Sequence, residues 1–237
     1  MEITRTLYIT NPKDWRDWLK KNYKTEKEIW LVYPKKETGK PRIEYNDAVE
    51  EALCFGWIDS IIKTLDEEQT VQRFSPRKPK AKYSQANIER LRTLVAGKKV
   101  VKEVEETLGD VLNKEFIIPA DILKAIKENK KVWKHFQAFS ASYIRIRIAF
   151  IDSARKRPEE FQKRLRHFIE MTEKNKMFGF GGIEKHYYNK AALPYLSFFL
   201  SLPFLSFLSW PSCAIISTAI ATANIRISFC PGSISTP

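Results

Sequence analysis

The feature that most constrains this 237-residue chain is an abrupt loss of charge near its C-terminal end. No charged residue occurs from Ala191 to Ile225, and Arg226 is the one charged residue after Lys190. The residues before this break mix charged, aromatic and aliphatic side chains, and they supply enough apolar material for a buried core. We therefore predict one soluble domain over residues 1–190 and a separate apolar, serine-rich tail over residues 191–237.

Three interpretations of the tail stay open. Its charge-free length exceeds the roughly 20 residues that span a bilayer, which favours a membrane anchor and a transmembrane segment. Pro203 and Pro211 interrupt it and serine recurs throughout, which favours a frame-shifted or read-through product that is disordered or non-native. A buried helix is the third interpretation. Because every Lys, Asp and Glu is lost after Lys190, we prefer the frame-shifted product.

Local patterns over residues 1–97 predict an α+β part. Asn11 before Pro12 is typical of a helix start. Gly56 is suited to end a helix over residues 45–55 in a left-handed conformation, and Asn46 or Asp47 is expected to cap that helix. Strands are expected at residues 6–10, 28–33, 57–65 and 70–74, the last two as a hairpin, followed by a helix from Ser84 to about Ala96.

Residues 98–190 predict a helical part with short turns. Ile144, Ile148 and Ile151 recur at helical spacing and indicate one buried face. Helices are expected near residues 103–108, 119–127, 130–139, 140–156 and 158–174. The fold class is therefore α+β, with an N-terminal strand, helix and hairpin unit followed by a C-terminal helical part.

The overall charge is +13, from 41 Lys and Arg against 28 Asp and Glu. Such a balance makes an acidic partner plausible, whether nucleic acid, a phosphorylated ligand or anionic lipid, but the even spread of the charges favours simply solvated basic helices. Three scattered cysteines and an N-terminus without an apolar run favour the reducing cytoplasm. The three histidines lie far apart in sequence and no Gly-rich phosphate loop occurs, so we predict no metal site and no cofactor.

The residues with the most chemistry lie between Glu50 and Lys78. If the predicted hairpin folds back, Asp59 and either Arg73 or Arg77 lie on neighbouring strands within reach of an ion pair. Asp59 then acts either as a general acid or base and anion-site partner, or as a structural salt-bridge acceptor. Trp57 is either a stacking platform for a ring ligand or a core residue.

A basic loop follows the hairpin. Arg77, Lys78, Lys80 and Lys82 either grip phosphates or are solvated, and the prolines within the loop stiffen its backbone. Lys35, Lys36, Lys40 and Arg42 extend the same basic surface if they fold beside it. Cys54 is a candidate nucleophile, but a helix C-terminus disfavours a thiolate, so a buried structural thiol is the favoured interpretation. The Phe178–Gly182 segment (F-G-F-G-G) either lies across a pocket or simply ends a helix.

The run A-L-C-F-G-W-I-D-S (residues 52–60), followed by F-S-P-R-K-P and by Tyr83, Ser84 and Asn87, resembles the signature of the YdeI/OmpD-associated, or bacteriocin-protection, family. The resemblance extends to Trp15 and Trp18 and to residues 175–187, and covers about residues 5–188. Where relatives tend to have Ser-x-Trp-Ser, this chain has Ala81-Lys82-Tyr83-Ser84. The resemblance implies a bacterial protein with a role in bacteriocin or stress tolerance, and it supplies no catalytic residue set.

Together these observations favour a non-catalytic cytoplasmic protein that binds an acidic ligand or partner. The candidate binding residues are Trp57, Asp59, Arg73, Arg77 and Lys78, and the catalytic residues are unknown. Two alternatives stay open: a nucleic-acid-binding module that uses the hairpin and basic loop, and an enzyme with a pocket around Asp59 and Arg77. A membrane partner follows only if the apolar segment at residues 191–225 is genuine.

Overall fold

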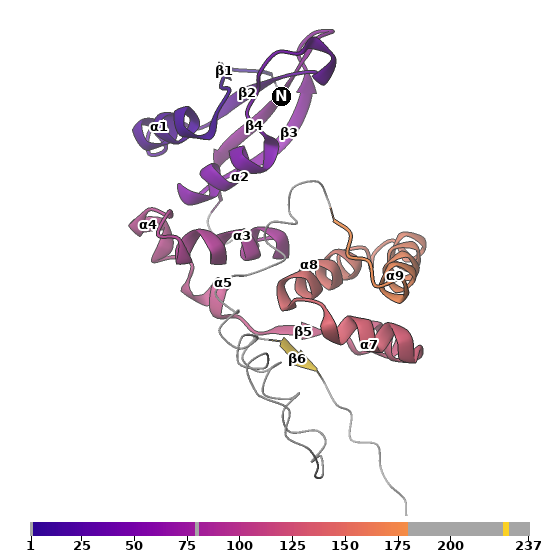
Figure 1. Cartoon of the computed structure of the whole chain (residues 1–237). Helices are drawn as coiled ribbons and strands as arrows, with labels where there is room; N and C mark the ends of the chain where they lie inside the picture. The colour runs from indigo at the N-terminus through magenta and orange to yellow at the C-terminus, as the bar shows by residue number, and fades with distance from the viewer. Residues whose placement is uncertain (1, 79–80, 180–224, 228–237) are drawn as a thin grey trace, which may run out of the picture. The chain divides into compact units, whose positions relative to one another are not determined.

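The computed structural model describes residues 2–78, 81–179 and 225–227. The chain forms two compact units, which meet in sequence between Leu112 and Asn113 (Figure 1). The predicted fold class, α+β with a helical C-terminal part, is confirmed. That residues 1–190 act as one domain stays a prediction.

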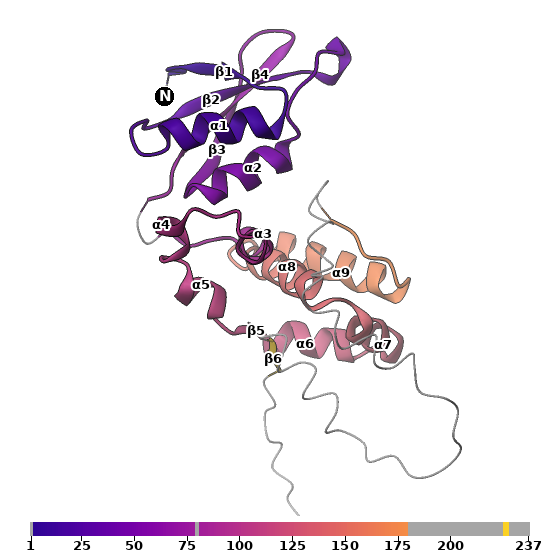
Figure 2. The ribbon, with the colours of Figure 1, turned by 60° about the vertical axis from the view of Figure 1, so that its left-hand side comes forward.

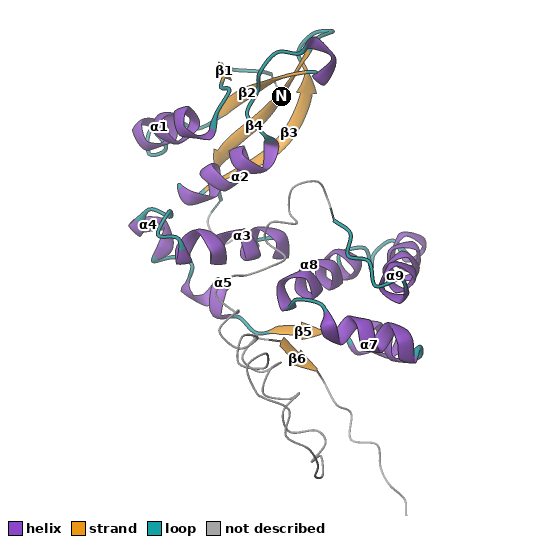
Figure 3. Cartoon of the chain, in the orientation of Figure 1, coloured by secondary structure: helices purple, strands orange, loops and turns teal. Residues whose placement is uncertain are grey.

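The first unit is built on a four-stranded sheet with the order β1-β2-β4-β3 (Figure 3). Its strands are β1 (Thr6–Tyr8), β2 (Ile29–Pro34), β3 (Trp57–Thr64) and β4 (Gln69–Pro76). β1 pairs with β2 in parallel, whereas β4 pairs antiparallel with both β2 and β3. The expected hairpin is therefore confirmed, with a register shift in β3 between Asp59 and Ile62.

Helices α1 (Pro12–Asn22) and α2 (Tyr45–Cys54) lie against one face of this sheet (Figure 2). Trp15, Trp57 and Phe74 are fully buried beneath them, and the Trp15 and Phe74 rings meet edge to face at 5.5 Å. The unit also contains the short η1 (Lys36–Thr38) and α3 (Gln85–Ala96), α4 (Lys102–Glu105) and α5 (Gly109–Asn113). A smaller cluster of Trp30, Val32 and Val71, with Ile3, covers the opposite face.

Two of the predicted helix caps are confirmed. The Asn11 side chain accepts the Asp14 N–H at 3.0 Å, and the Ser84 hydroxyl accepts the Asn87 N–H at 3.3 Å. The prediction for α2 is wrong, because its N-cap is Glu44, without a side-chain hydrogen bond. Asn46 lies inside the first turn instead, since that turn is held by tertiary contacts rather than by a local cap.

The second unit is mainly helical. It contains β5 (Phe116–Ile118), α6 (Ala120–Lys127), α7 (Lys130–Ala138), α8 (Ala141–Asp152) and α9 (Pro158–Glu173). The prediction of helices alone after Gly97 is wrong at β5, which pairs in parallel with β6 (Ile225–Ile227). A partner strand so distant in sequence leaves no local signal.

Helix α8 is buried more completely than its isoleucine pattern indicates. Every residue from Ser142 to Ile148 is buried, including Arg145 and Arg147. The helix ends at Asp152, earlier than the predicted Lys156. A helix that is buried on all sides must place its polar side chains against other protein groups, so these arginines have structural or binding contacts rather than solvent around them.

The tail lies almost entirely outside the described residues, so its three interpretations stay predictions. Residues 225–227 are its described part, as strand β6. Within the ranges that the structure describes, no helix is both long and apolar enough to cross a bilayer.

Gly56 offers a test of the first unit. Its φ is +72°, and a Cβ built there would lie 3.1 Å from Val104 Cγ2. We expect Gly56→Ala to lower the free energy of unfolding by about 1–2 kcal/mol from backbone strain, and by more from the contact with Val104. Chemical denaturation followed by tryptophan fluorescence measures this, because Trp15, Trp18, Trp30 and Trp57 all report on the first unit.

Two glycines serve as controls for that measurement. Gly39 also has a positive φ, of +63°, but open space around its Cβ position, so Gly39→Ala isolates the strain. Gly109 has open space and no positive φ, so Gly109→Ala should leave stability unchanged or slightly raised. Equal stability of Gly56→Ala and Gly109→Ala would contradict the role given to Gly56.

Candidate functional site

Trp57 lies in the core of the first unit. Its side chain is fully buried, and its Nε1–H donates to the Tyr23 carbonyl oxygen at 3.1 Å. The Trp18 ring packs edge to face against it at 5.8 Å. The indole therefore has the surroundings of a core residue, with no ring face open to a ligand.

Asp59 is held by neutral partners. Its Oδ2 accepts hydrogen bonds from the Tyr45 hydroxyl at 2.8 Å and from the Gln72 amide at 2.9 Å. The expected ion pair with Arg73 or Arg77 is not formed among the described residues. Asp59 pairs with Phe74 in the sheet register, so Arg73, one residue along β4, projects from the opposite face.

Arg73 forms an ion pair with Glu28 instead, the residue just before the neighbouring strand β2. The Arg73 Nε and Glu28 Oε2 atoms are 2.6 Å apart, with side chains 19% and 16% exposed. Hydrogen bonds from the Thr4 hydroxyl and from Arg73 lower the pKa of Glu28. This pair is a structural tie across one face of the sheet.

Arg77 holds the basic loop through hydrogen bonds to its backbone. Its Nη2 donates to the carbonyl oxygens of Ala81 and Lys82 at 3.1 and 3.0 Å, and its guanidinium stacks 3.7 Å from the Tyr83 ring centroid. Lys78 and Lys82 are exposed, whereas Pro79 and Lys80 lie outside the described residues. Phosphate binding by this loop stays a prediction, but the structure does not bring Arg77 into contact with Asp59.

Cys54 is fully buried. Burial, and then the negative charge of Glu51, raises the pKa of its thiol to about 11, against the opposing effect of Arg16. A protonated thiol inside the core is a poor nucleophile, so the structural interpretation of Cys54 is the better supported one.

A shallow basic groove of about 360 Å³ lies at the start of α1. Its lining contains three lysines, Lys13, Lys98 and Lys99, together with Arg16 and Glu51. Arg16 is already engaged, since it donates to Glu51 and to the Lys99 carbonyl oxygen, both at 2.7 Å. The free charge of the groove is therefore carried by flexible lysine side chains.

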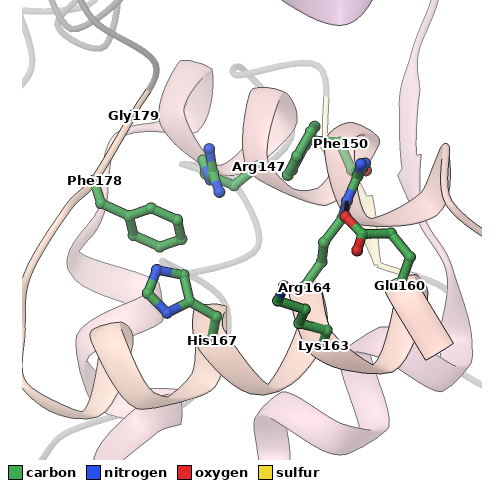
Figure 4. Close-up of a pocket in the computed structure, with 8 residues that line it drawn as sticks. All are labelled: Arg147, Phe150, Glu160, Lys163, Arg164, His167, Phe178 and Gly179. Carbon is green, nitrogen blue, oxygen red and sulfur yellow. Dashed lines mark hydrogen bonds and ion pairs between the residues drawn. The ribbon is translucent and has the colours of Figure 1, made fainter.

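The second unit holds a pocket that combines cations with aromatic rings (Figure 4). Its volume is about 260 Å³. Helices α8 and α9 and the segment after α9 supply its lining: Arg147, Phe150, Glu160, Lys163, Arg164, His167, Phe178 and Gly179. We call this the α8–α9 pocket. Its lining carries three cations and one carboxylate, so its local charge is positive with His167 neutral.

Ring stacking fixes the two arginines of this pocket. Arg147 Cζ lies 3.9 Å from the centroid of Phe178, and Arg164 Cζ lies 3.7 Å from that of Phe150. Arg164 also donates to Glu160 at 2.7 Å and to the Phe150 carbonyl oxygen at 2.8 Å. Figure 4 shows the Phe178 and His167 rings together at one end of the pocket, where their centroids are 4.6 Å apart.

Two family models match the chain in succession. Residues 7–107 match a model described as a domain of unknown function (DUF8412). Residues 115–175, which include α8 and α9, match the model described as Bacteriocin-protection, YdeI or OmpD-Associated. A YdeI/OmpD-associated domain is present in this chain. No curated protein and no solved structure matches it.

The match places the YdeI/OmpD-associated domain in the second unit. The resemblance to this family is thus confirmed, although the A-L-C-F-G-W-I-D-S run (residues 52–60) lies in the segment that matches the other model. Most residues that line the α8–α9 pocket lie within the matched segment, and Phe178 and Gly179 follow it directly.

The sequence offered the Phe178–Gly182 segment as one that lies across a pocket, and Phe178 and Gly179 do line the α8–α9 pocket, while residues 180–182 lie outside the described ranges. Sequence reasoning missed the arginines of this pocket, for which one signal was the alternation of Arg145 and Arg147 with isoleucines in a helix, unusual for a buried face. Which of these arginines meets a ring depends on how α9 packs, and that is a tertiary property. In the described part of the chain, no group of three or more His, Cys, Asp or Glu is placed to hold a metal ion.

The burial of Cys54 predicts slow thiol chemistry. In a chain with Cys213→Ser and Cys230→Ser, we expect Cys54 to react with a disulfide reagent at pH 8 at least about 100-fold more slowly than a free thiol. A pKa of about 11 leaves only a small thiolate fraction at that pH, and burial blocks access. The same reaction in denaturant is the control. A rapid reaction of the folded chain would restore Cys54 as a candidate nucleophile.

The Glu28–Arg73 pair predicts a pH-dependent contribution to stability. Because the pKa of Glu28 is below its ordinary value of 4.5, the carboxylate stabilises the fold above that pH and loses this effect on further acidification. Glu28→Gln should lower the free energy of unfolding at pH 7 by about 1–3 kcal/mol and reduce the loss between pH 5 and about pH 3. Glu67→Gln, in the exposed hairpin turn, is the control, and an identical acid dependence in both variants would contradict this assignment.

Proposed function

We propose that the protein is a non-catalytic binding protein for a small anionic ligand, held in the α8–α9 pocket of the YdeI/OmpD-associated domain. The observation that carries this proposal is the pairing of stacked arginines with a positively charged lining. We prefer this pocket to the hairpin and basic loop because it gathers three cations and two phenyl rings around one cavity.

The stacked arginines support recognition of a phosphate or carboxylate group. A guanidinium packed over a phenyl ring has lost most of its side-chain freedom, and Arg147 and Arg164 hold their positive charges in place at the pocket. Binding of an anion attracted by these charges then costs little further conformational entropy of the two side chains. Arg147 and Arg164 approach the pocket from different helices, so an anion between them would be contacted from two sides.

The remaining lining supports a small ligand with an apolar part. The pocket volume of about 260 Å³ is close to the lower end of ordinary ligand sites, at about 300 Å³. Phe150 and Phe178 provide apolar walls, and Lys163 adds a cation at the exposed side. Glu160 is tied to Arg164 at 2.7 Å, which favours a structural over a proton-transfer role and supports binding rather than catalysis.

The family description supports a bacterial role in bacteriocin protection. We propose that the chain acts in the cytoplasm by binding an anionic metabolite or an acidic group of a partner protein.

A nucleic acid is the second candidate partner. The basic groove at the start of α1 and the overall charge of +13 favour it. A groove lined by mobile lysines would bind a polyanion by releasing counterions, so the affinity would fall steeply with salt. Fluorescence-anisotropy titrations with DNA and RNA at two salt concentrations test this, and weak binding without a salt dependence would remove the candidate.

The pocket proposal predicts a selective effect of Lys163. We expect the full-length chain to bind phenyl phosphate more tightly than inorganic phosphate in isothermal titration calorimetry, because the former adds a ring that Phe150 and Phe178 can contact. Lys163→Ala should weaken phenyl phosphate binding about fivefold, as removal of one exposed charge-assisted contact costs up to about 1 kcal/mol.

Lys174→Ala is the matched control. Lys174 is an exposed lysine at the C-terminal end of α9 and does not line the pocket, so its removal changes the net charge equally. We expect its affinity for phenyl phosphate to equal that of the unmodified chain. Equal weakening in both variants, or no binding of either phosphate, would overturn the proposed site.

A further inference from the structure

A second group of polar residues gathers on the helix-covered face of the sheet in the first unit. Gln72 lies opposite Leu31, so Tyr33, two residues along β2, is its diagonal neighbour on the same face. Gln72 in turn donates to Asp59 at 2.9 Å. Five secondary structure elements supply this set, which we call the Asp59 cluster: Tyr33, Tyr45, Asn46, Asp59, Gln72, Asn87 and Arg90.

Arg90 is a buried cation whose direct partners are neutral. It is 7% exposed, and its Nη2 and Nη1 donate to the side-chain oxygens of Asn46 at 2.7 Å and Asn87 at 2.9 Å. Its Nε is buried and has no hydrogen-bond partner among the residues that the structure describes. Burial lowers the pKa of Arg90, while the charges of Tyr45, Glu50 and Asp59 oppose that effect. A buried N–H donor that bonds to nothing is costly, so it signals a place where a ligand atom or water belongs.

Tyr33 supplies a second unpaired donor beside the same groups. It is 7% exposed, and within the described part of the chain its hydroxyl has no hydrogen-bond partner. Burial raises the pKa of Tyr33, and the nearby Tyr45 and Asp59 raise it further, so the hydroxyl keeps its proton. Tyr33 is the diagonal neighbour of Gln72, which donates to Asp59, while Arg90 donates to Asn46, the residue after Tyr45. Because Tyr45 and Asp59 are hydrogen-bonded to each other, the two unpaired donors flank one pair of residues.

Asp59 adds an acceptor to these donors. Both of its hydrogen bonds are accepted by Oδ2, and Oδ1 accepts none from the described residues. The Tyr45 residue is 43% exposed, so its ring borders solvent while its hydroxyl contacts Asp59. The Asp59 cluster thus offers two donors and one acceptor next to a side chain that reaches the surface.

We propose that the Asp59 cluster is a binding site for an uncharged ligand that presents a hydrogen-bond acceptor and a donor on neighbouring atoms. The acceptor would meet Arg90 and Tyr33, and the donor would meet Asp59. A carboxamide and a vicinal diol share this chemistry. Because the charges of Arg90 and Asp59 offset each other and Glu50 adds a negative one, the cluster disfavours the anions that suit the α8–α9 pocket. This site does not depend on the proposed function.

The test uses the full-length chain with nicotinamide and acetamide as carboxamide probes and with D-ribose and D-glucose as diol probes. Saturation-transfer NMR titrations measure binding, and thermal denaturation measures stability. We expect one probe class to bind, and Tyr33→Phe to weaken that binding about tenfold. The same variant should melt at or above the temperature of the unmodified chain, because it removes a hydroxyl that makes no hydrogen bond.

Asp59→Asn and Asp17→Asn complete the comparison. Asp59→Asn should lose binding of the same probes, because its one carbonyl oxygen accepts from Tyr45 and Gln72 and its NH2 group donates where the ligand needs an acceptor. Asp17→Asn, on the exposed side of α1, should bind as the unmodified chain does. No binding of any probe, or unchanged binding by Tyr33→Phe, would overturn the proposal. A lower melting temperature of Tyr33→Phe would do so too, because it would mean that the hydroxyl is structurally bonded.

Discussion

The junction between α2 and β3 holds the first unit together. Gly56 adopts a left-handed conformation there, which lets the chain turn from helix into strand. Because glycine has no Cβ, the turn also avoids a close contact with Val104. Its carbonyl oxygen accepts the Arg77 N–H at 2.9 Å, and the Cys54 carbonyl oxygen accepts the Val101 N–H at 3.0 Å. One short turn therefore joins the helix layer, the end of the hairpin and the segment that leads to α4. It also fixes where β3 begins, and with it the positions of Trp57 and Asp59 in the sheet.

The arginines explain why a basic composition is a poor guide to a basic surface. Arg73 pairs with Glu28, Arg77 holds the loop after β4, and Arg90 is buried between asparagines. Each of these guanidinium groups bonds inside the protein, so part of the positive charge serves the fold. In the YdeI/OmpD-associated domain, Arg147 and Arg164 pack over aromatic rings and also line a pocket. The same residue type thus has structural and candidate binding roles that composition cannot distinguish.

Much of the secondary structure followed from local signals. The Asn11–Pro12 start of α1, the Ser84 cap of α3, the Gly56 turn and the β3–β4 hairpin each depend on neighbouring residues, so the sequence predicts them. The errors lie where distant partners decide. Tyr45 and Asn46 are held by Asp59 and Arg90 rather than by a cap, and β5 forms against a strand more than a hundred residues away. Local propensity carries no information about such partners.

By itself, the sequence determined the α+β class, the order of most elements and the family resemblance. The tertiary structure decided which side chains share a space. A one-residue offset in the sheet register puts Asp59 beside Gln72 and Tyr45 and sends Arg73 to the opposite face, toward Glu28. Likewise, only the packing of α9 against α8 brings Arg147 and Arg164 around one pocket. Both outcomes depend on contacts between distant segments, since hydrogen bonds and ring stacking act over a few ångströms whatever the separation along the chain.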